Sequence, residues 1–103
     1  MVIIVDAMGG DNAPEAIVNG CIDALLERNG FEILLVGDAG KIEKIIKERK
    51  YSGKGLRIHN ATEVIENNDV PVKAIKSKKD SSMVVGLNLL KEKKGEVFLS
   101  AGN

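Results

Sequence analysis

Apolar positions follow two different patterns along the chain, and the two patterns alternate. The first pattern is a short apolar stretch, which is typical of a strand. Residues 2–5 form an uninterrupted run of this kind, as expected for a strand buried on both sides. Stretches that include polar residues predict further strands at 31–36, 56–60 and 96–100. The second pattern repeats apolar residues every three or four positions, which predicts helices with one buried face; it covers residues 14–30, 41–50, 72–78 and 81–94. The segment 61–71 is polar and has neither pattern.

The helical spacing also predicts which side chains face the core. Pro14 suits the first turn of the first helix, where a missing N–H costs nothing, and Gly30 is expected as its C-terminal glycine. The predicted inner faces consist of Ile17, Val18, Cys21, Ile22, Leu25 and Leu26 in the first helix, Ile42, Ile45 and Ile46 in the second, and Met83, Val84, Leu87 and Leu90 in the last.

Strands that alternate with helices form βαβ units, so the fold class is α/β with a mostly parallel sheet and right-handed crossovers. We expect residues 1–103 to form a single α/β domain. In such folds a helix normally follows each strand, and the chain stops just after the last predicted strand. We therefore expect the chain to be a truncated, N-terminal part of a larger domain.

Composition excludes several classes of function. The 103 residues are 44% hydrophobic but only 3% aromatic, which argues against stacking platforms for single-stranded nucleic acid. Fifteen basic and fifteen acidic residues cancel, so no polyanion-binding surface and no nucleic-acid partner are expected. The single cysteine, Cys21, lies in a helical pattern and is expected to be a buried, reduced thiol of a cytosolic protein. No signal peptide or membrane-spanning segment is predicted.

Polar residues follow three of the predicted strands, at the ends that meet along one edge of a parallel sheet. They belong to the segments 6–12 (DAMGGDN), 37–38 (GD) and 100–103 (SAGN). A glycine pair lets the backbone approach a ligand closely, and the free N–H groups of the next helix favour an anion such as phosphate. The segments lack the GxxxxGK[ST] and GxGxxG patterns, so nucleotide or NAD binding has little support.

Several polar residues fit both a functional and a structural role. Asp6 follows a strand, as in aspartyl-phosphate enzymes, but Met8 stands where a second acid would be expected. Asp6 and Asp11 suit a hard metal ion, and they equally suit turns in which they bond their own backbone. For His59, the only histidine, a structural or solvent-facing role is favoured over catalysis.

A second candidate anion site lies at residues 76–83 (KSKKDSSM). Asp80 or Ser81 can cap the helix that follows. Lys78 and Lys79 precede that helix, so cations and helix N–H groups can converge on one anion. A capped surface helix with solvated lysines explains the same pattern equally well.

Four segments together resemble one family. They are VDAMGGDNAPEAIV (5–18), LVGD (35–38), KKDSSMVVGLNLLK (78–91) and SAGN (100–103), and ATEVI (61–65) and DVP (69–71) also fit. The chain resembles the PlsX family, the phosphate acyltransferases of fatty acid and phospholipid synthesis, collinearly over essentially its whole length. The combination of DAMGGDNAP, KKDSSM and SAGN is specific, whereas each alone is weak.

The resemblance implies an acyltransferase that converts acyl-acyl-carrier-protein and inorganic phosphate to acyl phosphate and free carrier protein, for phospholipid synthesis. It implies a three-layer α/β/α Rossmann-like fold, a homodimer, a cytoplasmic location and peripheral membrane association. No cofactor or metal is expected. The alternative is a non-catalytic phosphate- or acyl-binding α/β fragment. No acyl pocket, and hence no chain-length preference, can be traced in the pattern.

Candidate site residues follow from the strand-end chemistry and the resemblance together. We expect backbone N–H groups of the first loop to hold phosphate or the developing oxyanion, while the aspartates shape the loop. The candidate catalytic residues are Asp6, Asp11, Asn12 and Lys79. The candidate substrate-binding residues are Gly9, Gly10, Lys78, Ser81, Ser82, Ser100, Gly102 and Asn103.

Overall fold

A four-stranded parallel sheet forms the centre of the molecule. The computed structural model describes residues 1–66 and 69–101, so Gly102 and Asn103 lie outside the described residues. The strands are β1 (Val2–Asp6), β2 (Glu32–Gly37), β3 (Leu56–Asn60) and β4 (Val97–Leu99), and their order is β3-β2-β1-β4. Each neighbouring pair is parallel, which confirms the predicted α/β class with a parallel sheet.

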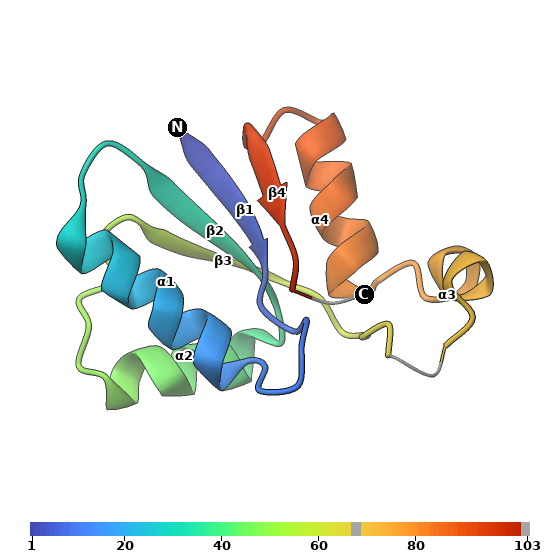
Figure 1. The fold of residues 1–103 in the computed structure, drawn as a ribbon, viewed down its shortest axis with the longest axis horizontal. Helices are drawn as coiled ribbons and strands as arrows, with labels where there is room; N and C mark the ends of the chain where they lie inside the picture. Colours follow the sequence, from blue (N-terminus) through green and yellow to red (C-terminus); the bar gives the residue numbers. More distant parts are fainter. Residues whose placement is uncertain (67–68, 102–103) are drawn as a thin grey trace.

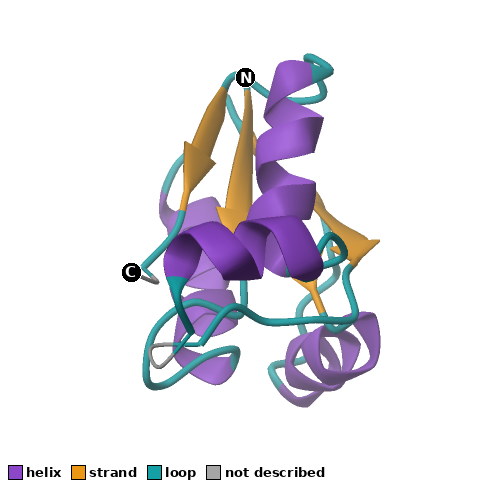
Figure 2. Ribbon diagram, turned by 90° about the vertical axis from the view of Figure 1, so that its right-hand side faces the viewer, coloured by secondary structure: helices purple, strands orange, loops and turns teal. Residues whose placement is uncertain are grey.

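Helices cover both faces of this sheet. They are α1 (Glu15–Glu27), α2 (Ala39–Glu48), α3 (Pro71–Ser77) and α4 (Ser82–Lys91). Helices α1 and α2 lie over one face and α4 lies over the other, while the short α3 stands apart from the sheet (Figure 1). Figure 2 views the molecule from the side that carries α3 and α4. The arrangement is the three-layer α/β/α architecture that was predicted.

Successive strand residues point into different cores, which explains why the apolar runs have no polar face. Val5 of β1 lies in one buried cluster with side chains of α1 and α2. Ile4, its neighbour, lies in the other cluster with Leu89 of α4. The first cluster contains Val5, Ala7, Val18, Ile22, Ile33, Leu35 and Ile42, and the second contains Ile4, Leu34, Val36, Ala61 and Leu89.

The predicted inner face of α4 was wrong in part. Its buried residues are Ser82, Gly86 and Leu89, whereas Leu87 is 44% exposed. The cause is a close approach to the sheet, because a Cβ atom on Gly86 would lie only 2.2 Å from Cε1 of Phe98. The helix therefore turns its glycine towards β4. Leu90 packs on the second cluster, as predicted.

Several element boundaries also differ from the prediction. Helix α1 ends at Glu27 because Arg28 is already extended, so Gly30 belongs to the turn before β2, and Leu26 is 65% exposed. Pro14 is the N-cap residue of α1. Helix α2 begins two residues early because Asp38 caps it. Within the described residues, no helix is long and apolar enough to cross a membrane.

Candidate functional site

The carboxyl ends of β1 and β4 meet at one polar contact. The Asp6 side chain is 3% exposed, and its two oxygen atoms accept separate hydrogen bonds. Oδ1 accepts the Met8 N–H over 2.9 Å, and Oδ2 accepts the Ser100 hydroxyl over 2.9 Å. The structure therefore brings two predicted site residues, 94 positions apart, into direct contact. The Asp6 carboxylate fixes the start of the first loop against the end of β4.

The first loop, residues 7–14, presents backbone donors beside this contact. Within the described part of the chain, the N–H groups of Gly9, Gly10, Asp11 and Asn12 donate no hydrogen bond. Gly10 has a φ of +92°, a conformation that L side chains rarely adopt, and a Cβ there would lie 3.6 Å from Cβ of Ala101. The loop thus lies against the segment after β4, and its unpaired amides are available to an anion.

The predicted strand-end residues Gly37 and Asp38 have structural roles. The Asp38 side chain accepts the Lys41 N–H over 3.1 Å and caps α2. Gly37 is buried against Met8, whose Cγ would lie 2.8 Å from an added Cβ. The side chain of Met8 thereby anchors the first loop on the end of β2.

A second polar cluster lies where the segment after β3 meets the start of α4. Oδ2 of Asp80 accepts the Thr62 N–H over 2.9 Å and the Thr62 hydroxyl over 2.5 Å. These two hydrogen bonds, the hydroxyl one first, lower the pKa of Asp80 below its ordinary value. Ser81 is fully buried and accepts the Val84 N–H over 3.2 Å, so it is the residue that caps α4. Ser82 is buried beside it.

The two candidate lysines have different surroundings. Nζ of Lys78 lies 2.8 Å from Oδ2 of Asp69 and 3.0 Å from the Val64 carbonyl. The hydrogen bond to Lys78 lowers the pKa of Asp69, and the same bond raises the pKa of Lys78. Lys78 therefore links the segment after β3 to the end of α3. Lys79 is exposed and makes no hydrogen bond or ion pair with the described residues.

The structure does not join the two clusters into one site by direct contact. Among residues 1–66 and 69–101, no hydrogen bond or ion pair links Lys78, Lys79, Ser81 or Ser82 to the first loop. Both clusters nonetheless follow the carboxyl ends of parallel strands, β1 and β3, where ligands gather in such sheets.

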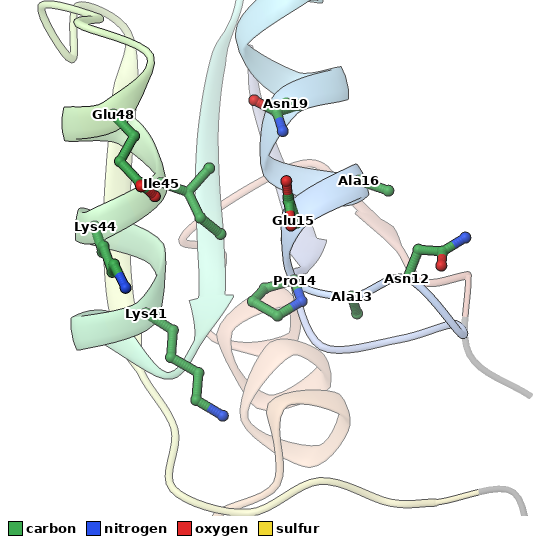
Figure 3. A pocket seen from close by; sticks show the side chains of 10 residues that line it. All are labelled: Asn12, Ala13, Pro14, Glu15, Ala16, Asn19, Lys41, Lys44, Ile45 and Glu48. Carbon is green, nitrogen blue, oxygen red and sulfur yellow. The ribbon is translucent and has the colours of Figure 1, made fainter.

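Another cavity lies away from both clusters, between α1 and α2. Its volume is about 670 Å³, and Figure 3 shows Lys41 and Ile45 reaching into it from α2. Lys41 and Lys44 share the cavity with Glu15 and Glu48, so the opposite charges cancel. Of the predicted site residues that the structure describes, Asn12 alone belongs to its lining. We therefore place the candidate site at the strand ends, where predicted residues meet.

Two remaining candidates fit structural roles. The Cys21 thiol is free, but it is only partly buried where a buried thiol was predicted, because it lies at the rim of the core next to the open side of α1. Its partial burial still raises its pKa to about 11, so it is protonated at neutral pH. His59 lies on β3 and is exposed. Within the described ranges, no group of three His, Cys, Asp or Glu side chains could hold a metal ion.

The sequence patterns missed the partners of the predicted residues. Thr62, Asp69 and Met8 complete the contacts of Asp80, Lys78 and Asp6, respectively. No periodicity indicates such pairings, because two of them join segments of unassigned polar chain. The available signals were the position of Thr62 just after a predicted strand and the fit of segments 61–65 and 69–71 to the family resemblance.

Comparison with known proteins gives one consistent family. The family described as fatty acid synthesis protein matches residues 1–103. A phosphate acyltransferase of Acetivibrio thermocellus is 67% identical over 103 residues, which are all of this chain and 30% of that relative. A phosphate acyltransferase of Clostridium botulinum is 50% identical over the whole chain and 31% of its own length, and one of Clostridioides difficile is 48% identical over 30% of its length. The chain thus spans about 30% of these relatives.

Proposed function

The chain belongs to the PlsX family of phosphate acyltransferases, and on this premise we propose that it supplies the phosphate-facing half of an acyltransferase site. The proposed reaction moves an acyl group from acyl carrier protein to inorganic phosphate, giving acyl phosphate for phospholipid synthesis and free carrier protein. The observation that carries the proposal is the first loop, whose four unpaired N–H groups lie beside the Asp6–Ser100 contact.

The reaction requires positioning more than a reactive side chain. A phosphate oxygen attacks the thioester carbonyl carbon, and negative charge builds on the carbonyl oxygen. The C–S bond then breaks, and the carrier's thiolate leaves and takes up a proton. Phosphate already carries negative charge at neutral pH, so rate depends on holding it in line and on donors aimed at the oxyanion. A protonated, partly buried Cys21 is consistent with a route that needs no enzyme nucleophile.

We assign the donors to the first loop. Backbone N–H groups of Gly9, Gly10 and Asn12 would bind phosphate or the oxyanion, with the macrodipole of α1 adding positive potential. Asp6 would hold those donors in place through its bonds to Met8 and Ser100. Asp11, exposed on the same loop, would shape it.

The second cluster would complete the site in the full protein. Lys79 is exposed and suits a direct phosphate contact, whereas Lys78 would hold the segment in place through its ion pair with Asp69. Ser81 and Ser82 would fix the N-terminus of α4 that faces the ligand. The remaining predicted ligands, Gly102 and Asn103, lie outside the described residues and stay a prediction from the sequence.

The finer properties of the family are further parts of the proposal. We propose a homodimer that works in the cytoplasm and associates peripherally with the membrane, with acyl carrier protein as its macromolecular substrate. The absence of an excess of positive charge, fifteen basic against fifteen acidic residues, agrees with a small-anion site and no nucleic-acid partner.

The test is phosphate-dependent release of carrier protein from palmitoyl-acyl carrier protein. We would compare this chain alone with a chimera in which it replaces the matching 30% of the Acetivibrio thermocellus phosphate acyltransferase. Turnover by the chimera alone is expected, because the chain supplies half a site. A folded chimera without turnover would contradict the acyltransferase proposal, and phosphate binding without turnover would favour the non-catalytic fragment.

Substitutions in the chimera test whether Lys79 binds phosphate specifically. Lys79→Ala is expected to raise the KM for phosphate about tenfold, as expected for the loss of one charge-assisted hydrogen bond. Lys76→Ala, which removes an exposed lysine of α3, is the matched control and should change nothing. Equal effects of the two substitutions would show that only general positive charge matters.

A further inference from the structure

An apolar groove runs from the candidate site along the side of α1. Its volume is about 540 Å³, and it lies between α1 and the β1–β4 edge of the sheet. One end contains the polar residues Asp6 and Ser100, with Ala101 beside them. The rest is apolar and is lined by Ile3, Val5, Ile17, Cys21, Phe31, Ile33 and Leu99, with the small residues Ala16, Gly20 and Ala24 on the helix.

The groove exists because α1 does not reach over β4. Leu99 pairs with Val5 in the parallel register, so both side chains point to the α1 face of the sheet. Val5 is covered there, but Leu99 is 53% exposed. Gly20 keeps the helix side of the groove open, since a Cβ at this position would meet no atom within 4 Å.

We propose that this groove holds the acyl chain of the substrate, with the thioester carbonyl at the Asp6–Ser100 end. The inference rests on the proposed function, and it adds the site that selects acyl chain length. Asp6, which lines the groove, directly precedes the first loop, whose unpaired N–H groups would bind phosphate or the oxyanion. A ligand with a charged or polar head and a long apolar tail matches a groove that is polar at one end only.

The length of the groove limits the tail. Ala16 lies at the polar end and Ala24 at the far end, so the groove follows α1 for eight residues, or about 12 Å. An extended hydrocarbon chain advances about 1.3 Å per carbon, so the groove holds about nine carbons before the tail passes Phe31. Each buried methylene contributes about fourfold to binding. Gly20 lies about halfway along.

The test fills the groove at two depths in the chimera. Gly20→Leu is expected to lower kcat/KM at least tenfold for octanoyl- and palmitoyl-carrier protein and to leave the butyryl substrate within twofold. Ala24→Leu, one helical turn deeper, should impair only the palmitoyl substrate. Leu26→Phe enlarges a side chain that is 65% exposed and lies outside the groove, and it should change none of the three.

A second readout does not depend on turnover. Cys21 lines the groove, so palmitate should slow its reaction with methyl methanethiosulfonate, which forms a mixed disulfide on the thiol and releases methanesulfinate, whereas acetate should not. The modified fraction is measured on the peptide that contains Cys21. Gly20→Leu should abolish this protection. If the chimera is inactive but palmitate protects Cys21, the groove assignment stands and the acyltransferase proposal fails. Equal losses for all three acyl lengths, or a rate of Cys21 modification that palmitate does not change, would overturn the groove assignment and indicate that polypeptide covers the groove.

Discussion

Removal of the Ser100 hydroxyl tests the contact that holds the candidate site together. Its hydrogen bond to the Asp6 carboxylate is 2.9 Å long, and Asp6 is 3% exposed. A hydrogen bond to a charged group contributes about 1.5–3 kcal/mol, so Ser100→Ala should lower the free energy of unfolding by that amount. In an Asp6→Asn background the bond is between neutral groups, and the same substitution should cost only about 1 kcal/mol.

Urea unfolding of the four proteins in this double-mutant cycle measures the difference. A coupling energy of about 1 kcal/mol between the two positions is expected, well above the ~0.3 kcal/mol of independent sites. Ser52→Ala is the matched control, because the Ser52 hydroxyl makes a 3.3 Å contact at an exposed turn and its loss should cost less than about 0.5 kcal/mol. Additive effects, or a Ser100→Ala cost no larger than the control, would refute the reasoning.

Three further outcomes are expected. The pKa of Asp69 is lowered and that of Lys78 is raised, so the ion pair should contribute its full stability between pH 3.8 and pH 10.5, the ordinary pKa values of the two groups. This contribution should be lost as pH falls through the lowered pKa of Asp69, or as pH rises through the raised pKa of Lys78. The melting temperature of Lys78→Met should therefore vary less with pH than that of the unchanged chain. Gly86→Ala should cost about 1–3 kcal/mol in urea unfolding through its clash with Phe98, and the cost should shrink in a Phe98→Leu background. Cys21, whose pKa is about 11, should react slowly with iodoacetamide at pH 8 and rapidly once unfolded; equally fast alkylation of the folded protein would contradict its burial.

The central strands and the parallel direction of the sheet were predictable because β1 and β2 are buried on both faces, whereas the edge strands β3 and β4 are largely exposed. Val2–Asp6 and Glu32–Gly37 carry apolar side chains in both clusters, and a run of that kind has few other stable arrangements. Helix α4 was harder, because its apolar residues occur on most of its sides. Only the approach of Phe98 to Gly86 decides which side is buried, and that contact joins two elements across a turn.

The candidate site was predictable in outline and not in its contacts. A parallel sheet brings the ends of β1 and β4 to one edge, so the meeting of Asp6 with Ser100 follows from topology. The partner of Lys78 lies in the polar segment before α3, where no periodicity indicates a structure. The groove depends on how far α1 extends over the sheet, a distance that no local pattern contains.

Amide chemical shifts during a phosphate titration test the central claim, that the first loop binds the anion, most directly. Nitrogen-15 spectra of the 103-residue chain should show saturable shifts at Gly9, Gly10, Asp11 and Asn12, whose N–H groups are unpaired. Gly53, in a distant turn, should not move. Shifts confined to lysines on the surface, or no saturable shift in a folded chain, would contradict the account.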